Sequence, residues 1–154
     1  MAEIAVLSNL SAVVCCGVKL SISLYEFEAS LGSASRELKN LGSDIAHFCS
    51  VLKQVQSFLR RAKSFKVLPS AIQTVQIILD KSQEHFDGLS AILSKMRKAD
   101  RSQVDLVKRV RWTFKKPKVL LLQDGLRSCD AMLHLMLTTL GFAHMLAATN
   151  RYEL

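Results

Sequence analysis

The stretch AVLSNLSAVVCCGVKLSISLYEF, residues 5–27, is mostly apolar, contains a single lysine and contains no proline. On a helical projection of residues 2–28, aliphatic side chains spread over a broad face, and a narrow polar strip lies opposite. The strip consists of Ser8, Asn9, Ser11, Lys19 and Ser23. This pattern predicts an opening helix that is almost surrounded by apolar neighbours.

Two more helices follow from apolar residues at steps of three and four. The second is expected from about residue 34 to about 63, with an inward stripe of Leu38, Leu41, Ile45, Phe48, Leu52, Val55 and Leu59. The third is expected from Pro69 to about residue 97, because a proline in the first turn forfeits no intrahelical hydrogen bond. Its inward residues are Ile72, Val75, Ile78, Leu79, Phe86, Leu89, Ile92, Leu93 and Met96.

The last third of the chain predicts a short helix and a long one. Asp100 suits the N-cap of the short helix, which ends near Trp112. Its inward side chains are Val104, Val107, Val110 and Phe114, and its outward ones are Lys108, Arg111 and Lys115. Pro117 disfavours helical geometry at Lys116, so a break or kink is expected before a last helix over residues 117–149. Residues 131–150 carry no Asp, Glu, Lys or Arg, which is typical of the central helix of a bundle.

Composition supports one all-α domain over residues 1–154, an up-and-down bundle of four long helices plus one short helix. The chain is 49% hydrophobic but only 6% aromatic, and its 2 prolines and 6 glycines are too few for the frequent turns of β architectures. The four cysteines, Cys15, Cys16, Cys49 and Cys129, are expected as reduced thiols in a cytoplasmic protein. Whether Cys15 or Cys16 carries a lipid stays open.

Positive charge is concentrated in one segment of a chain whose net charge is +8. Ten of the 21 lysines and arginines lie in residues 95–118. The candidate residues for binding anionic lipid are Lys95, Arg97, Lys98, Lys108, Arg109, Arg111, Lys115, Lys116 and Lys118. Electrostatic attraction alone does not distinguish lipid from nucleic acid, from an acidic partner or from a merely solvated surface. No recognition motif surrounds Trp112 and Phe114, so nucleic acid is not the expected partner.

The sequence predicts no catalytic residue, no metal site and no cofactor. A di-metal bundle needs two Glu-x-x-His pairs, and the nearest match, Asp44 with His47, occurs once. His47 and His85 have no visible partner. His134 and His144 are interpreted as hydrogen-bonded or partly exposed residues of the last helix.

With the helices placed, the whole chain resembles the HeLo-like N-terminal domains of fungal signalling proteins. The resemblance rests on the opening helix with its Ser-Ala-Val-Val-Cys-Cys-Gly centre (11–17), on Leu-Tyr-Glu-Phe (24–27) and on Arg-Val-Arg-Trp-Thr-Phe-Lys-Lys (109–116). A long leucine-rich helix then begins with Leu-Leu-Leu-Gln-Asp-Gly-Leu (120–126). The order of these segments carries the match.

This resemblance implies a function in programmed cell death, heterokaryon incompatibility and fungal innate immunity. Such domains stand at the front of NOD-like receptors and ankyrin-repeat proteins, and they are similar to the four-helix executioner bundle of mixed-lineage kinase domain-like protein. A receptor or sensor domain after residue 154 is therefore implied. So are self-association on activation, movement from the cytoplasm to the plasma membrane, and pore formation there.

The opening helix is a marginal membrane span. Residues 4–18 are uncharged but give only about 22 Å of helix, and about 33 Å is reached if Lys19 snorkels and the helix continues to Tyr25. The candidate inserting residues are Ile4, Val6, Leu7, Leu10, Val13, Val14, Val18, Leu20, Ile22 and Leu24. Residues 131–150 are a rival span by hydropathy, and the resemblance is what favours the first helix. A self-association or adaptor domain without membrane activity is the alternative function.

Overall fold

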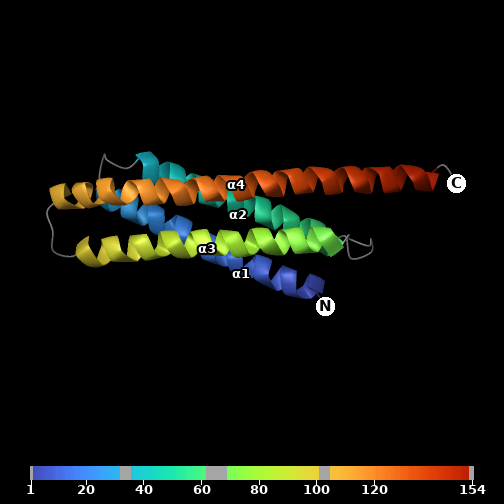
Figure 1. Cartoon of the computed structure of the whole chain (residues 1–154), viewed down its shortest axis with the longest axis horizontal. Helices are drawn as coiled ribbons and strands as arrows, with labels where there is room; N and C mark the ends of the chain where they lie inside the picture. Colours follow the sequence, from blue (N-terminus) through green and yellow to red (C-terminus); the bar gives the residue numbers. More distant parts are fainter. Residues whose placement is uncertain (1, 32–35, 62–68, 101–104, 153–154) are drawn as a thin grey trace.

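The computed structural model describes residues 2–31, 36–61, 69–100 and 105–152, and all of them are helical. The helices are α1 (Ala2–Leu31), α2 (Arg36–Arg61), α3 (Pro69–Asp100) and α4 (Asp105–Tyr152), which pack into one elongated bundle (Figure 1). Side chains at 2–3, 30–31, 99–100, 105–110, 147 and 152 are not described. The all-α bundle predicted from the sequence is confirmed.

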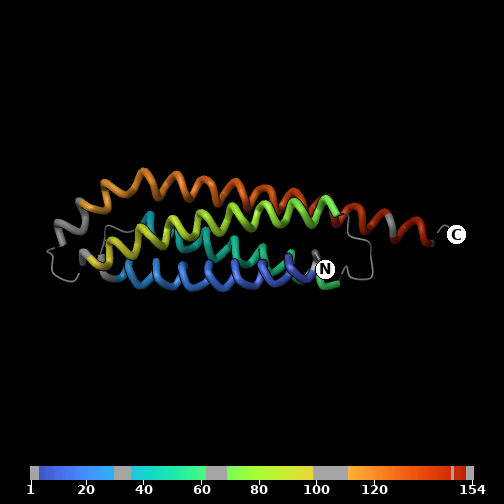
Figure 2. Tube along the Cα trace, turned by 60° about the horizontal axis from the view of Figure 1, so that its bottom comes forward, coloured from blue at the N-terminus to red at the C-terminus, as the bar shows by residue number. Residues whose placement is uncertain are grey.

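Chain direction alternates from helix to helix, but the neighbours in space are not simply consecutive (Figures 1 and 2). α1 packs on α2 and α3, and α4 packs on α3 and α2, so α1 and α4 lie across a diagonal. α1 is therefore parallel to α3, and α2 is parallel to α4. Two seams of parallel helices result, one between α1 and α3 and one between α2 and α4.

Buried side chains recur every seven residues along the helices, as in coiled coils and four-helix bundles. On α1 the two rows are Val6, Val13, Leu20 and Phe27, and Leu10, Gly17 and Leu24. On α4 the main row is Trp112, Val119, Leu126 and Leu133. Every inward residue predicted for α2 and α3 is buried, so both of those stripes are confirmed.

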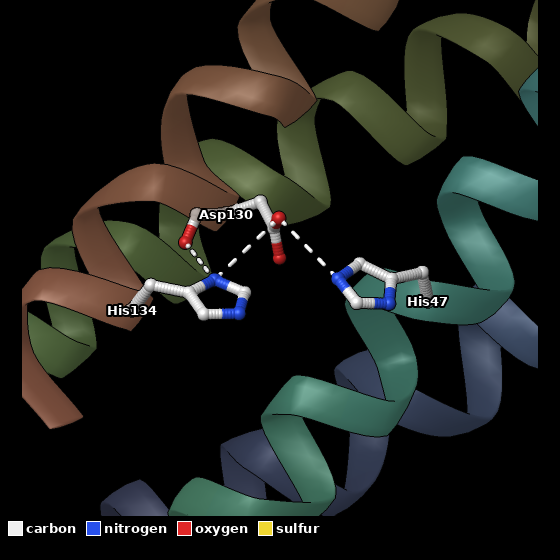
Figure 3. A group of neighbouring side chains, drawn as sticks. All are labelled: His47, Asp130 and His134. Carbon is white, nitrogen blue, oxygen red and sulfur yellow. Dashed lines mark hydrogen bonds and ion pairs between the residues drawn. The ribbon is translucent and has the colours of Figure 1, made fainter. Parts of the chain in front are cut away.

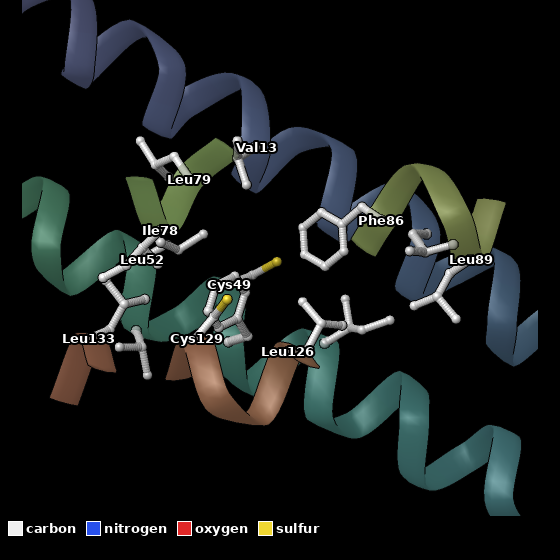
Figure 4. Close-up of a cluster of buried hydrophobic side chains, with 14 of the residues drawn as sticks. Val13, Cys49, Leu52, Ile78, Leu79, Phe86, Leu89, Leu126, Cys129 and Leu133 are labelled. Carbon is white, nitrogen blue, oxygen red and sulfur yellow. The ribbon is translucent and has the colours of Figure 1, made fainter. Parts of the chain in front are cut away.

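Buried side chains of α1, α2, α3 and α4 meet in the middle of the bundle (Figure 4). Phe86 of α3 is fully buried and meets Phe48 of α2 edge to face, with ring centroids 6.0 Å apart. A Cβ atom added at Gly17 would lie 2.4 Å from Cys49 Sγ and 2.9 Å from Phe86 Cε2. Burial raises the pKa of the Cys49 thiol to about 11, so this cysteine serves as an apolar core residue. Gly17 is what lets α1 approach so closely.

The expectation that α1 is almost surrounded by apolar neighbours is wrong. Ile4, Val18 and Ile22 are exposed, together with most of the polar strip. The physical reason is the four-cornered arrangement, in which α1 has two close neighbours and its outer face meets solvent. The helix is peripheral, not central.

The expected break at Lys116 is also absent, because α4 is continuous through Pro117. The residues of the short predicted helix form the opening part of α4 instead of a separate helix. Phe114, predicted to face inward, is 80% exposed. Trp112 occupies the buried row, and two residues further along a helix is about 200° around it. The described side chains do not include Val104, Val107 and Val110.

The interpretation of residues 131–150 as a central, buried helix is wrong as well. The last turns of α4 run past the ends of the other three helices (Figures 1 and 2). The large apolar side chains that are most exposed in this part are called the apolar end of α4: Leu135, Phe142, Met145 and Leu146. With 48 residues against 26 to 32 in the other helices, α4 is too long for its partners to cover.

Candidate membrane-contact surfaces and a histidine–aspartate cluster

The ten candidate inserting residues of α1 divide between core and surface. Val6, Leu10, Val13, Leu20 and Leu24 are buried, Leu7 and Val14 are half-buried, and Ile4, Val18 and Ile22 are exposed. Both α1 over Ile4–Ala29 and α4 over Arg111–Arg151 are long and apolar enough to cross a membrane, a property that core helices of soluble bundles share. Only 39% of the α1 window and 12% of the α4 window are buried. Neither apolar helix is enclosed by its neighbours.

Polar side chains tie α1 to both of its neighbours. Asn9 Nδ2 donates to Gln76 Oε1 of α3 over 3.0 Å, and Gln56 Nε2 of α2 donates to Ser11 Oγ over 2.7 Å. Asn9 therefore joins the polar strip to α3, and Ser11 joins it to α2. Ser8 and Lys19 face solvent, and Ser23 is half-buried.

Arg97 fastens the C-terminal part of α1 to α3. Its guanidinium donates to the backbone carbonyl of Ser23 over 3.0 Å and to Glu26 Oε2 over 3.4 Å. A groove of about 420 Å³ runs beside this contact, lined by Leu20, Ser23, Ser90, Leu93, Ser94, Arg97 and Lys98. Arg97, predicted to bind lipid, is thus already engaged by α1.

The end of the bundle where α3 stops and α4 starts carries the predicted basic residues. Lys95, Arg111, Phe114 and Lys115 line one cavity of about 220 Å³ together with Met96, and we call these four the basic–aromatic surface. Lys98 and Lys118, which are close to these residues in the sequence, are also exposed. The described side chains do not include Lys108 and Arg109. An exposed phenylalanine ringed by cations suits the boundary between lipid headgroups and acyl chains.

Lys116 differs from the other predicted lipid-binding residues because it faces α2. Its ammonium donates to Glu37 Oε1, and Trp112 Nε1 donates to Glu37 Oε2 over 3.4 Å. The hydrogen bond from Lys116 holds the pKa of Glu37 below its usual range, and the Trp112 bond acts in the same direction against burial. Lys116 therefore fixes the start of α4 on α2.

Replacing Glu37 with glutamine is expected to make the free energy of unfolding depend less steeply on pH in the acid range. The pKa of Glu37 is lower in the folded state than in the unfolded state. Its contribution to stability is therefore present at pH values above the unfolded-state pKa of about 4.3, and it is lost as the pH falls through the folded-state pKa. The loss at pH 7 should be below about 1 kcal/mol, since Glu37 and Lys116 are both more than a third exposed. Urea midpoints measured across the acid range test this, with Glu84→Gln on α3 as control. Equal slopes for wild type and Glu37→Gln would contradict it.

A cluster of two histidines and an aspartate lies further along the same α2–α4 seam (Figure 3). Asp130 Oδ2 is 3.7 Å from His47 Nε2 and 3.6 Å from His134 Nδ1, and the two imidazole rings stack with centroids 5.8 Å apart. The expectation that His47 lacks a partner is therefore wrong. Parallel packing of α2 on α4 brings His47 and Asp130 together, and the sequence alone does not reveal which helices are neighbours.

The geometry thus offers two kinds of function. The apolar, peripheral helices and the basic–aromatic surface of the bundle suit contact with lipid. The histidine–aspartate cluster offers ligands to a cation. Comparisons of the chain with protein-family profiles, with curated proteins and with solved structures returned no match.

Proposed function

We propose that this chain is a non-enzymatic, membrane-acting bundle whose first helix leaves its neighbours on activation and enters a bilayer. The observation that carries the proposal is the position of α1, an apolar helix of spanning length that lies at a corner of the bundle with its outer face in solvent. The proposal extends to the cell-death execution, the self-association, the move from cytoplasm to plasma membrane and the following receptor domain that the HeLo-like resemblance implies.

The alternating chain direction supports this proposal, because it places the C-terminal end of α1 at the same end of the bundle as the basic–aromatic surface. α1 ends, α3 ends and α4 begins at the same end of the bundle (Figure 1). A bundle that rests on anionic lipid through the basic–aromatic surface therefore holds the C-terminal end of α1 close to the membrane. Each lysine or arginine near such a surface contributes about 1 kcal/mol to binding. Once its contacts with α2 and α3 break, the N-terminal part of α1 can swing about its C-terminal end toward the lipid.

Release of α1 exchanges one apolar environment for another. Burying an aliphatic side chain is worth about 1.5–3 kcal/mol relative to water, and five of the ten inserting candidates are buried in the bundle. Those side chains keep most of this free energy if they move into acyl chains. Ile4, Val18 and Ile22, which are exposed in the bundle, gain it. The polar contacts of Asn9, Ser11 and Arg97 are what oppose release.

Cross-linking α1 in place provides the decisive experiment. Asn9 and Gln76 touch across α1 and α3, so cysteines at both positions, bridged by a short bifunctional maleimide in a background with serine at positions 15 and 16, hold α1 down. We expect the bridged protein to lose dye release from anionic liposomes, and the unbridged protein to retain it.

A matched bridge controls for the chemistry of the cross-link. Arg127 Nε donates to Asp44 Oδ2 over 3.1 Å, and both side chains are accessible, so cysteines at these two positions join α2 to α4 without touching α1. This bridge should leave leakage unchanged. Undiminished leakage from the α1–α3 bridged protein would refute insertion of α1.

The apolar end of α4 favours a second candidate function, self-association of the bundle. Leu135, Phe142, Met145 and Leu146 are large apolar side chains exposed on one helix. Sedimentation analysis of a Phe142→Ser, Met145→Ser variant tests this alternative. A wild-type oligomer that dissociates in the variant while liposomes stay intact with either protein would favour the adaptor function over the membrane-acting one.

A further inference from the structure

The histidine–aspartate cluster plays no part in the proposed membrane contact, because α1 and the basic–aromatic surface contribute nothing to it. His47 comes from α2, and Asp130 and His134 come from successive turns of α4 (Figure 3). From this arrangement we propose that His47, Asp130 and His134 bind a divalent transition-metal ion of the Zn²⁺ class and thereby clip α4 to α2.

The separations of the ligand atoms fit a single small ion. One ligand atom from each of the three residues can be chosen so that all lie within 4.8 Å of one another. The two distances from Asp130 Oδ2 are 3.6 and 3.7 Å. Bonds of about 2.0–2.1 Å around tetrahedral Zn²⁺ place neighbouring ligand atoms about 3.3 Å apart. Small side-chain movements therefore suffice to close the site.

The carboxylate of Asp130 is incompletely satisfied by the protein. Oδ1 is buried and has no hydrogen-bond partner among the described residues. Oδ2 lies too far from either imidazole for a good hydrogen bond, which requires about 3.2 Å or less. A buried acceptor without a partner is costly. A cation bound at Oδ2 compensates the charge of the whole carboxylate, including the oxygen that faces inward.

The ligand set selects the class of metal. Two imidazole nitrogens and one carboxylate oxygen suit Zn²⁺, Co²⁺, Ni²⁺ and Cu²⁺, whereas Ca²⁺ and Mg²⁺ favour oxygen ligands alone. The side chains of His47 and His134 are 62% and 53% exposed, and that of Asp130 is 25% exposed. An ion can therefore enter from solvent and keep a water molecule at the fourth position.

One existing hydrogen bond must be exchanged. His134 Nδ1 lies 2.9 Å from the backbone carbonyl oxygen of Asp130, to which a protonated Nδ1 donates. Coordination through Nδ1 requires the tautomer that carries the proton on Nε2, so the proton moves from Nδ1 to Nε2 by way of solvent and a metal bond replaces the hydrogen bond. The carbonyl lies inside a helix and keeps its backbone partner. The exchange therefore leaves no orphaned group behind.

The proposed metal has a structural consequence, because its ligands lie on two helices and come together only in the folded chain. Zn²⁺ should raise the melting temperature by mass action. The clip would lie next to the seam contacts of Asp44 with Gln123 and Arg127, before α4 runs out to its apolar end. The ion would then hold α4 against α2 at the point from which the last turns of α4 project.

The experiment uses the full 154-residue chain, freed of metal with a chelator and titrated with ZnCl₂ by calorimetry and by thermal unfolding. We expect one equivalent to bind and the melting temperature to rise, with no rise in CaCl₂. Asp130→Asn and His47→Ala should each weaken Zn²⁺ binding by about 10-fold or more. His144→Ala, on the same helix outside the cluster, and Cys15→Ser, which removes an exposed thiol, should bind as the wild type does.

Hydrogen exchange separates a clip from adventitious binding at one helix. With Zn²⁺, amides should exchange more slowly in both α2 and α4, and this slowing should vanish in His47→Ala. Absence of stoichiometric binding, unchanged affinity in Asp130→Asn, or loss of binding in Cys15→Ser would each overturn the proposal. None of these outcomes bears on insertion of α1, so the two proposals stand or fall separately.

Discussion

Replacing Phe86 with alanine is expected to lower the free energy of unfolding by about 3–5 kcal/mol, the usual cost of removing a large side chain from a packed core. Phe86 is fully buried between α1 and α2 and meets Phe48 edge to face. Its loss removes this aromatic pair and leaves a cavity beneath Gly17, where α1 lies close to α2 and α3. Urea unfolding followed by circular dichroism measures the change.

Phe114→Ala is the matched control for this substitution. It removes the same side chain from α4, where Phe114 is 80% exposed, so the change should stay within about 0.5 kcal/mol. The same control protein tests the basic–aromatic surface, because it should bind anionic liposomes more weakly while remaining as stable as wild type. Comparable destabilisation by both substitutions would contradict the observed packing of α4.

Replacing Gly17 with leucine should destabilise the bundle by about 3 kcal/mol, at the upper end of the usual cost of overpacking. The first added atom already meets Cys49 Sγ and Phe86 Cε2, so the remaining atoms of the side chain have no space. The intrinsic preference of leucine over glycine in a helix, about 1 kcal/mol, offsets only part of this cost. The least costly response is for α1 to move away from α2 and α3.

Gly141→Leu provides the control, because nothing lies within 4 Å of a Cβ atom added at Gly141. This variant should be as stable as wild type or slightly more so, which calorimetric melting would register. If α1 is the inserting helix, Gly17→Leu should also release dye from anionic liposomes at a lower protein concentration than wild type does. A stable Gly17→Leu protein would show that α1 does not pack where the structure places it.

Periodicity predicted much of the fold, because burial in a bundle repeats along each helix. The stripes from Leu38 to Leu59 and from Ile72 to Met96 are buried as expected, and Pro69 opens α3. Periodicity failed at Phe114, which was placed on one inward face with Val104, Val107 and Val110. One proline inside a long helix was tolerated, and the buried row through Trp112 set the phase instead.

The candidate sites were less predictable, because they depend on which helices are neighbours. Asp130 is 83 residues from His47 in the sequence, and only the parallel packing of α2 on α4 brings them together. Arg97 and Lys116 were identified by charge alone, yet each is occupied by a carboxylate of another helix. The exposure of Phe142 and Met145 could not be foreseen either, since it depends on where α2 ends and α3 begins.

The diagonal placement of α1 and α4 bears on what survives activation. α4 touches both α2 and α3, and Phe48 of α2 meets Phe86 of α3 across the centre. Withdrawal of the first helix would therefore leave a contiguous three-helix remnant instead of three separate rods. Such a remnant could stay folded at the membrane surface as a platform on which several copies gather.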